Sequence, residues 1–124
     1  MMSALSQIYH ILDEIQFLES KVNSTKNAKA NFLKNETLKR AFCRSLEVIG
    51  GSVRKLPLGI YKEYPNISWK RYADIHNRLV NCYGCVDYDL VWDVAENHLK
   101  QLKQYLEHIV AMETQKDEEE QGIG

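Results

Sequence analysis

The stretch LKRAFCRSLEVIGGSVRKL, residues 38–56, carries the clearest folding signal in the sequence. Its apolar side chains recur at steps of three and four residues, at Leu38, Phe42, Leu46, Ile49, Val53 and Leu56. This spacing places them on one stripe of an α-helix. We therefore predict a helical region over residues 26–55, with a break near Asn35, where Asn35-Glu36-Thr37 forms a capping sequence.

Gly50 and Gly51 lie inside this helical pattern. Two glycines destabilise a helix by about 1–2 kcal/mol relative to alanine. We expect that another helix packs closely against the chain at this point. A kink beside a site is the alternative.

The same periodicity predicts three more helices. The first covers residues 3–22. The third follows Ser68 as its N-cap and ends at Gly84, and the fourth covers residues 88–114 after Asp87. Between the second and third helices, we interpret residues 57–66 as a loop because two prolines and a glycine fall in it.

No strand-like alternation is present, and two Pro and six Gly are too few for an all-β fold. The predicted fold is therefore all-α, an antiparallel bundle of four to five helices. We assign residues 1–113 to one helical domain. Residues 114–124 are acidic and poor in apolar side chains, which predicts a disordered tail.

The net charge is −1, from 16 Lys and Arg against 17 Asp and Glu, and this total argues against a nucleic-acid partner. The distribution along the chain argues otherwise. Residues 21–55 hold nine basic residues and only two acidic ones. Such a segment can contact phosphate, although a solvated helix face is the simpler interpretation.

Several kinds of site are absent from the sequence pattern. The pair Cys82 and Cys85 has no second pair to complete a zinc site, and no His follows a Glu at the spacing used by di-iron bundles. We predict no metal and no cofactor, and we read the two cysteines as small, partly buried helix-end residues. No apolar run is long enough for a membrane span, and no secretory signal is present, so we expect a cytoplasmic protein without a membrane partner.

The most distinctive stretch is YPNISWKRYADIHNRLVNCYGCVDYDLVW, residues 64–92. It contains a Pro-x-Ile-x-Trp element, then Tyr83, Val86-Asp87 and Val91-Trp92. Together with Arg44, Leu46-Glu47 and Ile49-Gly50 upstream, this spacing resembles the HepT family of HEPN domains. These are ribonuclease toxins encoded beside MntA nucleotidyltransferase antitoxins. The resemblance covers roughly residues 36–110.

The resemblance implies a homodimer with an RNA-cleaving cleft between the protomers. It also implies metal-independent attack of the RNA 2′-hydroxyl on the adjacent phosphorus. The family's catalytic Arg and His are replaced here by His76 and Asn81, and a usual Glu by Gly51. Asn81 cannot transfer a proton at neutral pH, and His76 lacks the planar fork with which Arg binds phosphate. We therefore expect impaired cleavage. The alternative interpretation of His76 is a purely structural one, in which its side chain packs beside Tyr72.

Only Tyr83 of the Arg/His/Tyr motif is retained. In the family, the MntA-type antitoxin transfers AMP to this tyrosine, so Tyr83 is a candidate AMP acceptor. A packed helix-end aromatic is the alternative. Arg78 and Arg44 are candidate RNA-binding residues.

Three hypotheses follow from the resemblance. The first is a HepT-like toxin of a type VII toxin–antitoxin system that pairs with a MntA-like nucleotidyltransferase and cleaves RNA poorly. The second is a non-catalytic dimeric binding partner or substrate subunit of that nucleotidyltransferase. The third is an inactivated form of an active toxin, since replacement of His by Asn is nearly isosteric.

Overall fold

The computed structural model describes residues 4–25, 27–79 and 85–120, with only the backbone at His76. Every regular element in these ranges is a helix, which confirms the predicted all-α class. Within the same ranges, no helix is both long enough and apolar enough to cross a membrane.

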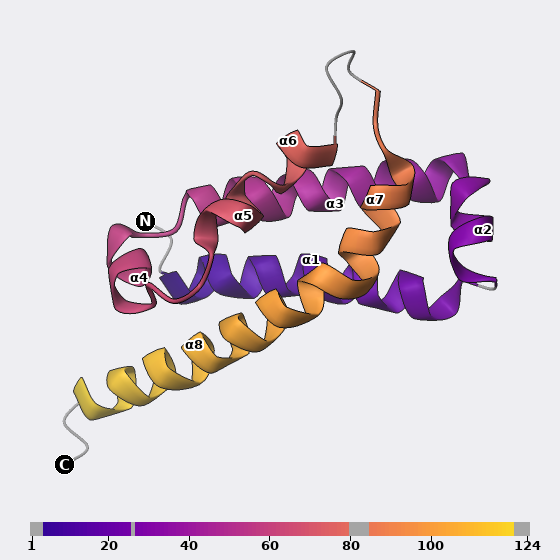
Figure 1. The fold of residues 1–124 in the computed structure, drawn as a ribbon. Coiled ribbons are helices and arrows are strands. Elements are labelled where there is room, and N and C mark those ends of the chain that lie inside the picture. The colour runs from indigo at the N-terminus through magenta and orange to yellow at the C-terminus, as the bar shows by residue number, and fades with distance from the viewer. Residues whose placement is uncertain (1–3, 26, 80–84, 121–124) are drawn as a thin grey trace.

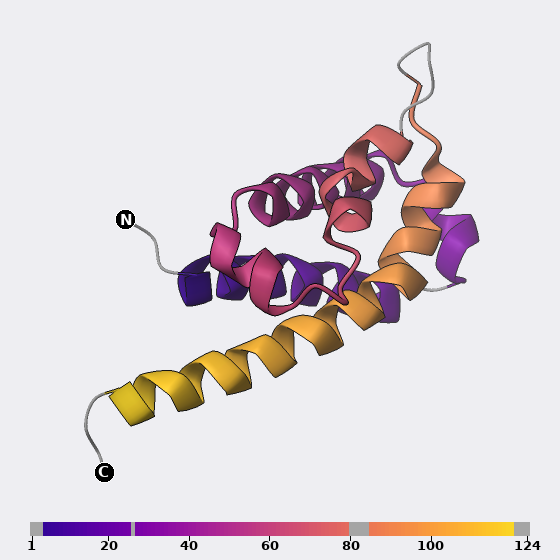
Figure 2. The same ribbon diagram turned by 60° about the vertical axis from the view of Figure 1, so that its left-hand side comes forward.

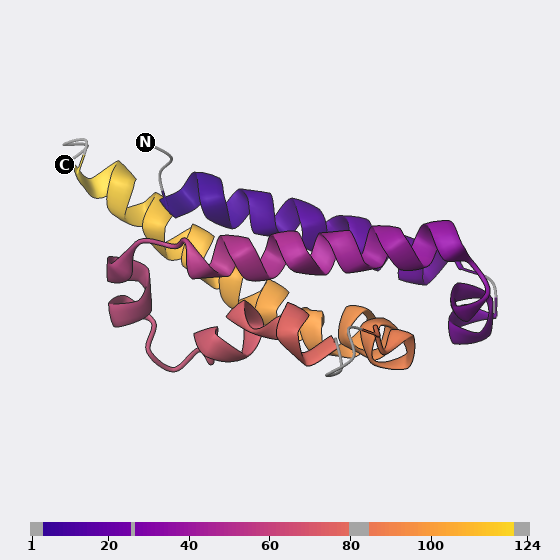
Figure 3. The ribbon, with the colours of Figure 1, turned by 90° about the horizontal axis from the view of Figure 1, so that it is seen from above.

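Two long helices form the centre of the molecule. Helices α1 (Ala4–Ser24) and α3 (Glu36–Arg54) lie side by side and antiparallel, and the short helix α2 (Ala28–Leu33) lies across one end of the pair (Figures 1 and 3). The predicted break at Asn35 is confirmed. Its side chain accepts a hydrogen bond from the Leu38 amide at 3.0 Å and so caps α3.

A third long helical run packs across this pair. It consists of α7 (Tyr88–Asp93), one π-helical segment η1 (Val94–His98) and α8 (Leu99–Glu120) (Figure 2). The Asp87 carboxylate accepts the Leu90 amide at 3.1 Å and caps the run, as its position in the sequence predicted. The π-helical segment widens the helix by one residue, which the regular apolar spacing did not reveal.

The core lies where these helices meet. It is built from apolar stripes on the three long elements, namely Ile8, Ile11, Ile15 and Leu18, then Phe42, Leu46, Ile49 and Val53, then Leu99, Leu102, Leu106 and Ile109. At the α2 end the core is aromatic. The ring of Phe32 lies 4.8 Å from that of Phe42 and 5.1 Å from that of Trp92, measured between centroids. These contacts attach α2 and α7 to α3.

The predicted loop over residues 57–66 is wrong in part, because Leu58–Glu63 forms helix α4. Pro57 stands at its N-cap, where a missing N–H costs nothing. Ile60 is buried against the core, and the Tyr61 hydroxyl donates to the Val53 carbonyl at the end of α3. Tertiary contacts of this kind override weak local propensity over one or two turns.

Helix α8 continues to Glu120, through residues 114–120 of the stretch that we expected to be disordered. Lys116 on this part of α8 pairs with Glu113 one turn back and with Glu63 on α4. Residues 121–124 lie outside the described ranges. The division of the chain at residue 113 stays a prediction.

Candidate functional site

The predicted third helix contains the family-like motif, and the structure divides it in two. Helix α5 (Trp69–Ala73) ends at Asp74, and α6 (Ile75–Leu79) begins directly after it. Ser68 stands at the N-cap of α5, as predicted, but its side chain makes no capping hydrogen bond. Both α5 and α6 lie against α3 (Figure 1).

Gly50 allows this close packing. A Cβ atom at position 50 would lie 3.1 Å from the Ala73 carbonyl oxygen and 3.3 Å from Cγ2 of Ile75. The expected close helix approach is therefore confirmed at Gly50. Gly51 differs, because a Cβ there would meet no atom within 4 Å.

Arg54, one turn after Gly50, fastens the break at Asp74. Its Nη2 donates to the Ala73 carbonyl at 2.6 Å and lies 3.4 Å from Oδ1 of Asp74. The Ala73 carbonyl, the last of α5, thus accepts its hydrogen bond from a side chain. The next carbonyl, that of Asp74, accepts from the Arg78 amide at 3.2 Å, as the first turn of α6 requires. Sequence reasoning missed this role for Arg54, because nothing in its spacing points to a residue 19 positions away.

The motif positions are only partly visible. His76 is the second residue of α6, and Arg78 on the same helix is exposed. Asn81, Tyr83 and Cys82 lie outside the described residues. Tyr72, the neighbour proposed for a packed His76, is buried.

Arg44 is on a different side of α3. It stands six residues before Gly50, so an ideal helix places it about 120° away from the face that contacts α5 and α6. Its guanidinium is largely exposed and pairs with Glu47 at 3.4 Å. With Asp13, Glu14 and Phe17 of α1 it lines a cavity of about 370 Å³. Arg44 and Arg78 are therefore not brought together in this chain.

A second polar cluster links α5 to the π-helical segment. Nη2 of Arg71 donates to Nδ1 of His98 at 2.6 Å, and Nε2 of His98 lies 3.3 Å from Oδ2 of Asp93. Since Arg can only donate, this contact requires the His98 tautomer that carries its proton on Nε2. The Asn97 amide donates to the other Asp93 oxygen at 2.9 Å. No sequence pattern indicates the contact between Arg71 and His98, because the two residues lie 27 positions apart.

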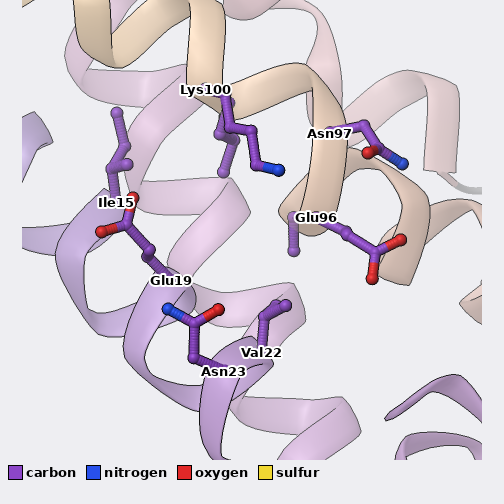
Figure 4. Close-up of a pocket in the computed structure, with 9 residues that line it drawn as sticks. Ile15, Glu19, Val22, Asn23, Glu96, Asn97 and Lys100 are labelled. Carbon is purple, nitrogen blue, oxygen red and sulfur yellow. The ribbon is translucent and has the colours of Figure 1, made fainter.

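A cavity of about 220 Å³ lies between α1 and the start of α8. Figure 4 shows Glu19 and Asn23 on α1 facing Glu96, Asn97 and Lys100 on the other wall. Apolar side chains, including Ile15 and Val22, complete the lining. Both carboxylate oxygens of Glu19 lie 3.1 Å from Nζ of Lys103, so this charge is already neutralised.

Several tyrosines near the motif are held in their neutral form. Burial raises the pKa of Tyr72, which lies between α5 and the core. Burial, together with a hydrogen bond to Glu113, raises the pKa of Tyr64 to about 12. Burial also raises the pKa of the Cys43 thiol, and the nearby Glu47 adds to the effect. Cys85 is exposed, unlike the partly buried position expected for it.

The sequence matches the family model described as Ribonuclease HepT-like over residues 10–109. A protein of Methanocaldococcus jannaschii whose name describes it as an RNase is 35% identical over 109 residues, covering 87% of this chain and 90% of that protein. A protein of Caldanaerobacter subterraneus subsp. tengcongensis with a similar name is 32% identical over 104 residues, covering 84% and 91%.

A protein of Thermococcus cleftensis whose name describes it as a ribonuclease HepT is 27% identical over 73 residues, which cover 59% of this chain and 66% of that protein. No solved structure matches the chain at a significant level.

Proposed function

This chain belongs to the HepT-like ribonuclease family, and on that premise we propose that it is a HepT-like HEPN toxin component whose RNA cleavage is impaired. Its fold and the extent of the match support an RNA-directed role. The replacement of two catalytic residues supports the impairment. We propose that it acts in the cytoplasm as a homodimer, with a MntA-like nucleotidyltransferase as its antitoxin.

The observation that carries this proposal is a preserved scaffold with altered chemistry. Gly50 and Arg54 hold the start of α6, the helix that bears His76, against α3, which supports a positioned scaffold for this part of the motif. The residues at the family's Arg and His positions are nevertheless His76 and Asn81. A scaffold that keeps its geometry but loses its proton-transfer group should retain RNA contact and lose turnover.

The lost proton transfer has a predictable cost. General acid–base catalysis by one side chain contributes about 10²–10⁴-fold to a rate. An amide at position 81 forms hydrogen bonds but cannot act as a general acid or base at neutral pH. His76 supplies a smaller and only partly protonated group in place of a guanidinium, so phosphate binding weakens as well.

The experiment compares this chain with the double variant His76→Arg, Asn81→His on single-stranded RNA without added metal. We expect the double variant to cleave at least about 100-fold faster than the unmodified chain. Cleavage yields a 2′,3′-cyclic phosphate and a 5′-hydroxyl, which mass spectrometry of the fragments identifies. Equal cleavage by the unmodified chain would contradict the impairment.

The alternative function is a non-catalytic partner of the nucleotidyltransferase. Retention of Tyr83, the AMP acceptor of the family, favours it despite the loss of the other two motif residues. If this alternative holds, neither the chain nor the double variant cleaves RNA. The chain then gains a single AMP adduct with the nucleotidyltransferase and ATP, and Tyr83→Phe does not.

A further inference from the structure

A cavity lies between the N-terminal part of α1 and the C-terminal end of α3. It has a volume of about 300 Å³ and is lined by Gln7 and His10 of α1 and by Ser52 and Lys55 of α3. We propose that this cavity binds a phosphate group, carried either by RNA or by a free mononucleotide. The RNA source rests on the proposed function, whereas the mononucleotide source does not.

The four lining side chains suit an anion. Lys55 carries a full positive charge, and Ser52, His10 and the Gln7 amide each offer a hydrogen-bond donor. None of the lining residues is acidic. Three other cavities differ in this respect, because Glu19 and Glu96 line one, Asp13 and Glu14 another, and Glu63 the third. Charge therefore selects this cavity for phosphate.

Gln7 provides a second, independent observation. In the described part of the chain, its Oε1 is the one buried side-chain oxygen or nitrogen that lacks a hydrogen-bond partner. A buried polar atom without a partner is costly, at about 1–3 kcal/mol, and calls for an explanation. A ligand hydroxyl or amino group can donate to this oxygen, and a rotated amide can instead donate to a phosphate oxygen.

The helix ends around the cavity are compatible with an anion. Gln7 lies in the first turn of α1, a helix of 21 residues whose N-terminal end favours negative charge. The C-terminal end of α3 disfavours an anion, because helix carbonyls carry partial negative charge there. Two of these carbonyls already accept hydrogen bonds from the chain itself. The Ser52 carbonyl accepts from the Lys55 amide at 3.2 Å, and the Val53 carbonyl accepts from the Leu56 amide and the Tyr61 hydroxyl.

The volume favours a phosphate with its attached sugar over a lone ion. Pockets that hold small molecules begin at about 300 Å³. Ser52 stands two residues after Gly50, so an ideal helix places it about 200° around α3 from the side that contacts α5 and α6. The cavity is therefore a separate contact from the motif positions on α6. In the RNA case, it would hold a backbone phosphate away from the reacting bond.

The experiment uses the full ¹⁵N-labelled chain with three probes: inorganic phosphate, 5′-AMP and a 2′-O-methyl oligonucleotide, which has no free 2′-hydroxyl and so is not cleaved by this chemistry. NMR follows the Gln7 side-chain amide and the His10 imidazole. We expect shifts at both groups. Lys55→Gln should weaken binding about tenfold or more, as for loss of one charge-assisted hydrogen bond.

The matched control is Lys34→Gln, an exposed lysine at the end of α2, the opposite end of the α1–α3 pair (Figure 1). It removes the same charge and should leave affinity within about twofold, with thermal unfolding verifying both folds. For the oligonucleotide, Lys55→Gln should also lower the slope of log K against log salt by about 0.7.

The probes separate the two sources. Tighter binding of the oligonucleotide than of 5′-AMP assigns the site to RNA, and binding of 5′-AMP alone assigns it to a free nucleotide. Shifts with inorganic phosphate alone would overturn the proposal, since the site would then hold an adventitious ion only. Equal loss in Lys55→Gln and Lys34→Gln, or no shift with any probe, would overturn it too. None of these outcomes depends on cleavage, so failure of this proposal can be distinguished from failure of the proposed function.

Discussion

Two junctions between helices in this molecule are built in opposite ways. At the α3–α5 junction, Gly50 packs so closely against the Ala73 backbone that a Cβ would lie 3.1 Å from its carbonyl oxygen, and Arg54 donates to the same oxygen. At the α4–α8 junction, the contacts run through the ends of side chains. There the Tyr64 hydroxyl donates to Glu113 at 3.1 Å, and Lys116 pairs with Glu63. Close packing against the backbone holds the first junction, whereas side-chain hydrogen bonds and ion pairs, which water can replace, hold the second.

This difference gives the largest predicted effect to a change of volume at the first junction. Gly50→Leu places a side chain where even a Cβ would lie 3.1 Å from a backbone oxygen. Because the Ala73 backbone cannot move without displacing α5, we expect a loss of about 1–3 kcal/mol in the free energy of unfolding, measured by urea denaturation.

Gly51→Ala is the matched control. A Cβ there meets open space within a helix, so the stability should rise by about 0.5–1 kcal/mol. If the two substitutions change stability in the same direction, packing does not distinguish the two glycines and the comparison of junctions fails.

The same pair shows how much the sequence can reveal. Two adjacent glycines in a helical stripe predicted a close approach, and the structure places that approach at Gly50. The sequence could not say which of the two made it, because the partner backbone at Ala73 is not adjacent in sequence. The apolar stripes and the caps at Asn35 and Asp87 were predictable because each is encoded within one or two helical turns.

The α4–α8 junction was not predictable, because its contacts join residues that are distant in the sequence. The prolines and glycine of residues 57–66 indicate a loop locally, but Ile60 is buried in the core and the Tyr61 hydroxyl donates to Val53 of α3, and only the folded chain supplies these contacts. Lys116 likewise pairs with a residue 53 positions earlier, so composition alone indicated a disordered tail. In the candidate site, His76 and Asn81 came from family-like spacing, whereas the Arg54 and Arg71 contacts required the fold.

The second prediction tests the polar part of the α3–α5 junction. Arg54→Ala removes the hydrogen bond to the Ala73 carbonyl and leaves that carbonyl to water. Because the Arg54 side chain is about half exposed, at 53%, we expect a loss of only about 1 kcal/mol in the free energy of unfolding. Protection of the α6 amides against hydrogen exchange should fall as well.

The matched control is Arg44→Ala on the same helix. Arg44 makes only an exposed pair with Glu47, so its removal should cost less than about 0.5 kcal/mol and leave the exchange at α6 unchanged. Similar exchange profiles for the two variants would mean that Arg54 does not hold the break at Asp74.

The smallest effect belongs to the α4–α8 junction and depends on pH. The folded protein holds the Tyr64 proton more tightly than the unfolded chain, because burial and Glu113 raise its pKa from the ordinary value near 10 to about 12. The resulting stabilisation is complete below about pH 10 and is lost as the pH rises to about 12. Tyr64→Phe should cost about 0.5–1 kcal/mol at neutral pH, for one partly exposed hydrogen bond. It should also flatten the fall in stability between pH 10 and 12.

Urea denaturation across this range measures both effects. Tyr9→Phe, which changes an exposed tyrosine on α1, is the control and should keep the wild-type profile. An unchanged slope in Tyr64→Phe would show that this proton is not linked to folding. The α4–α8 junction would then rest on Lys116 and the burial of Ile60.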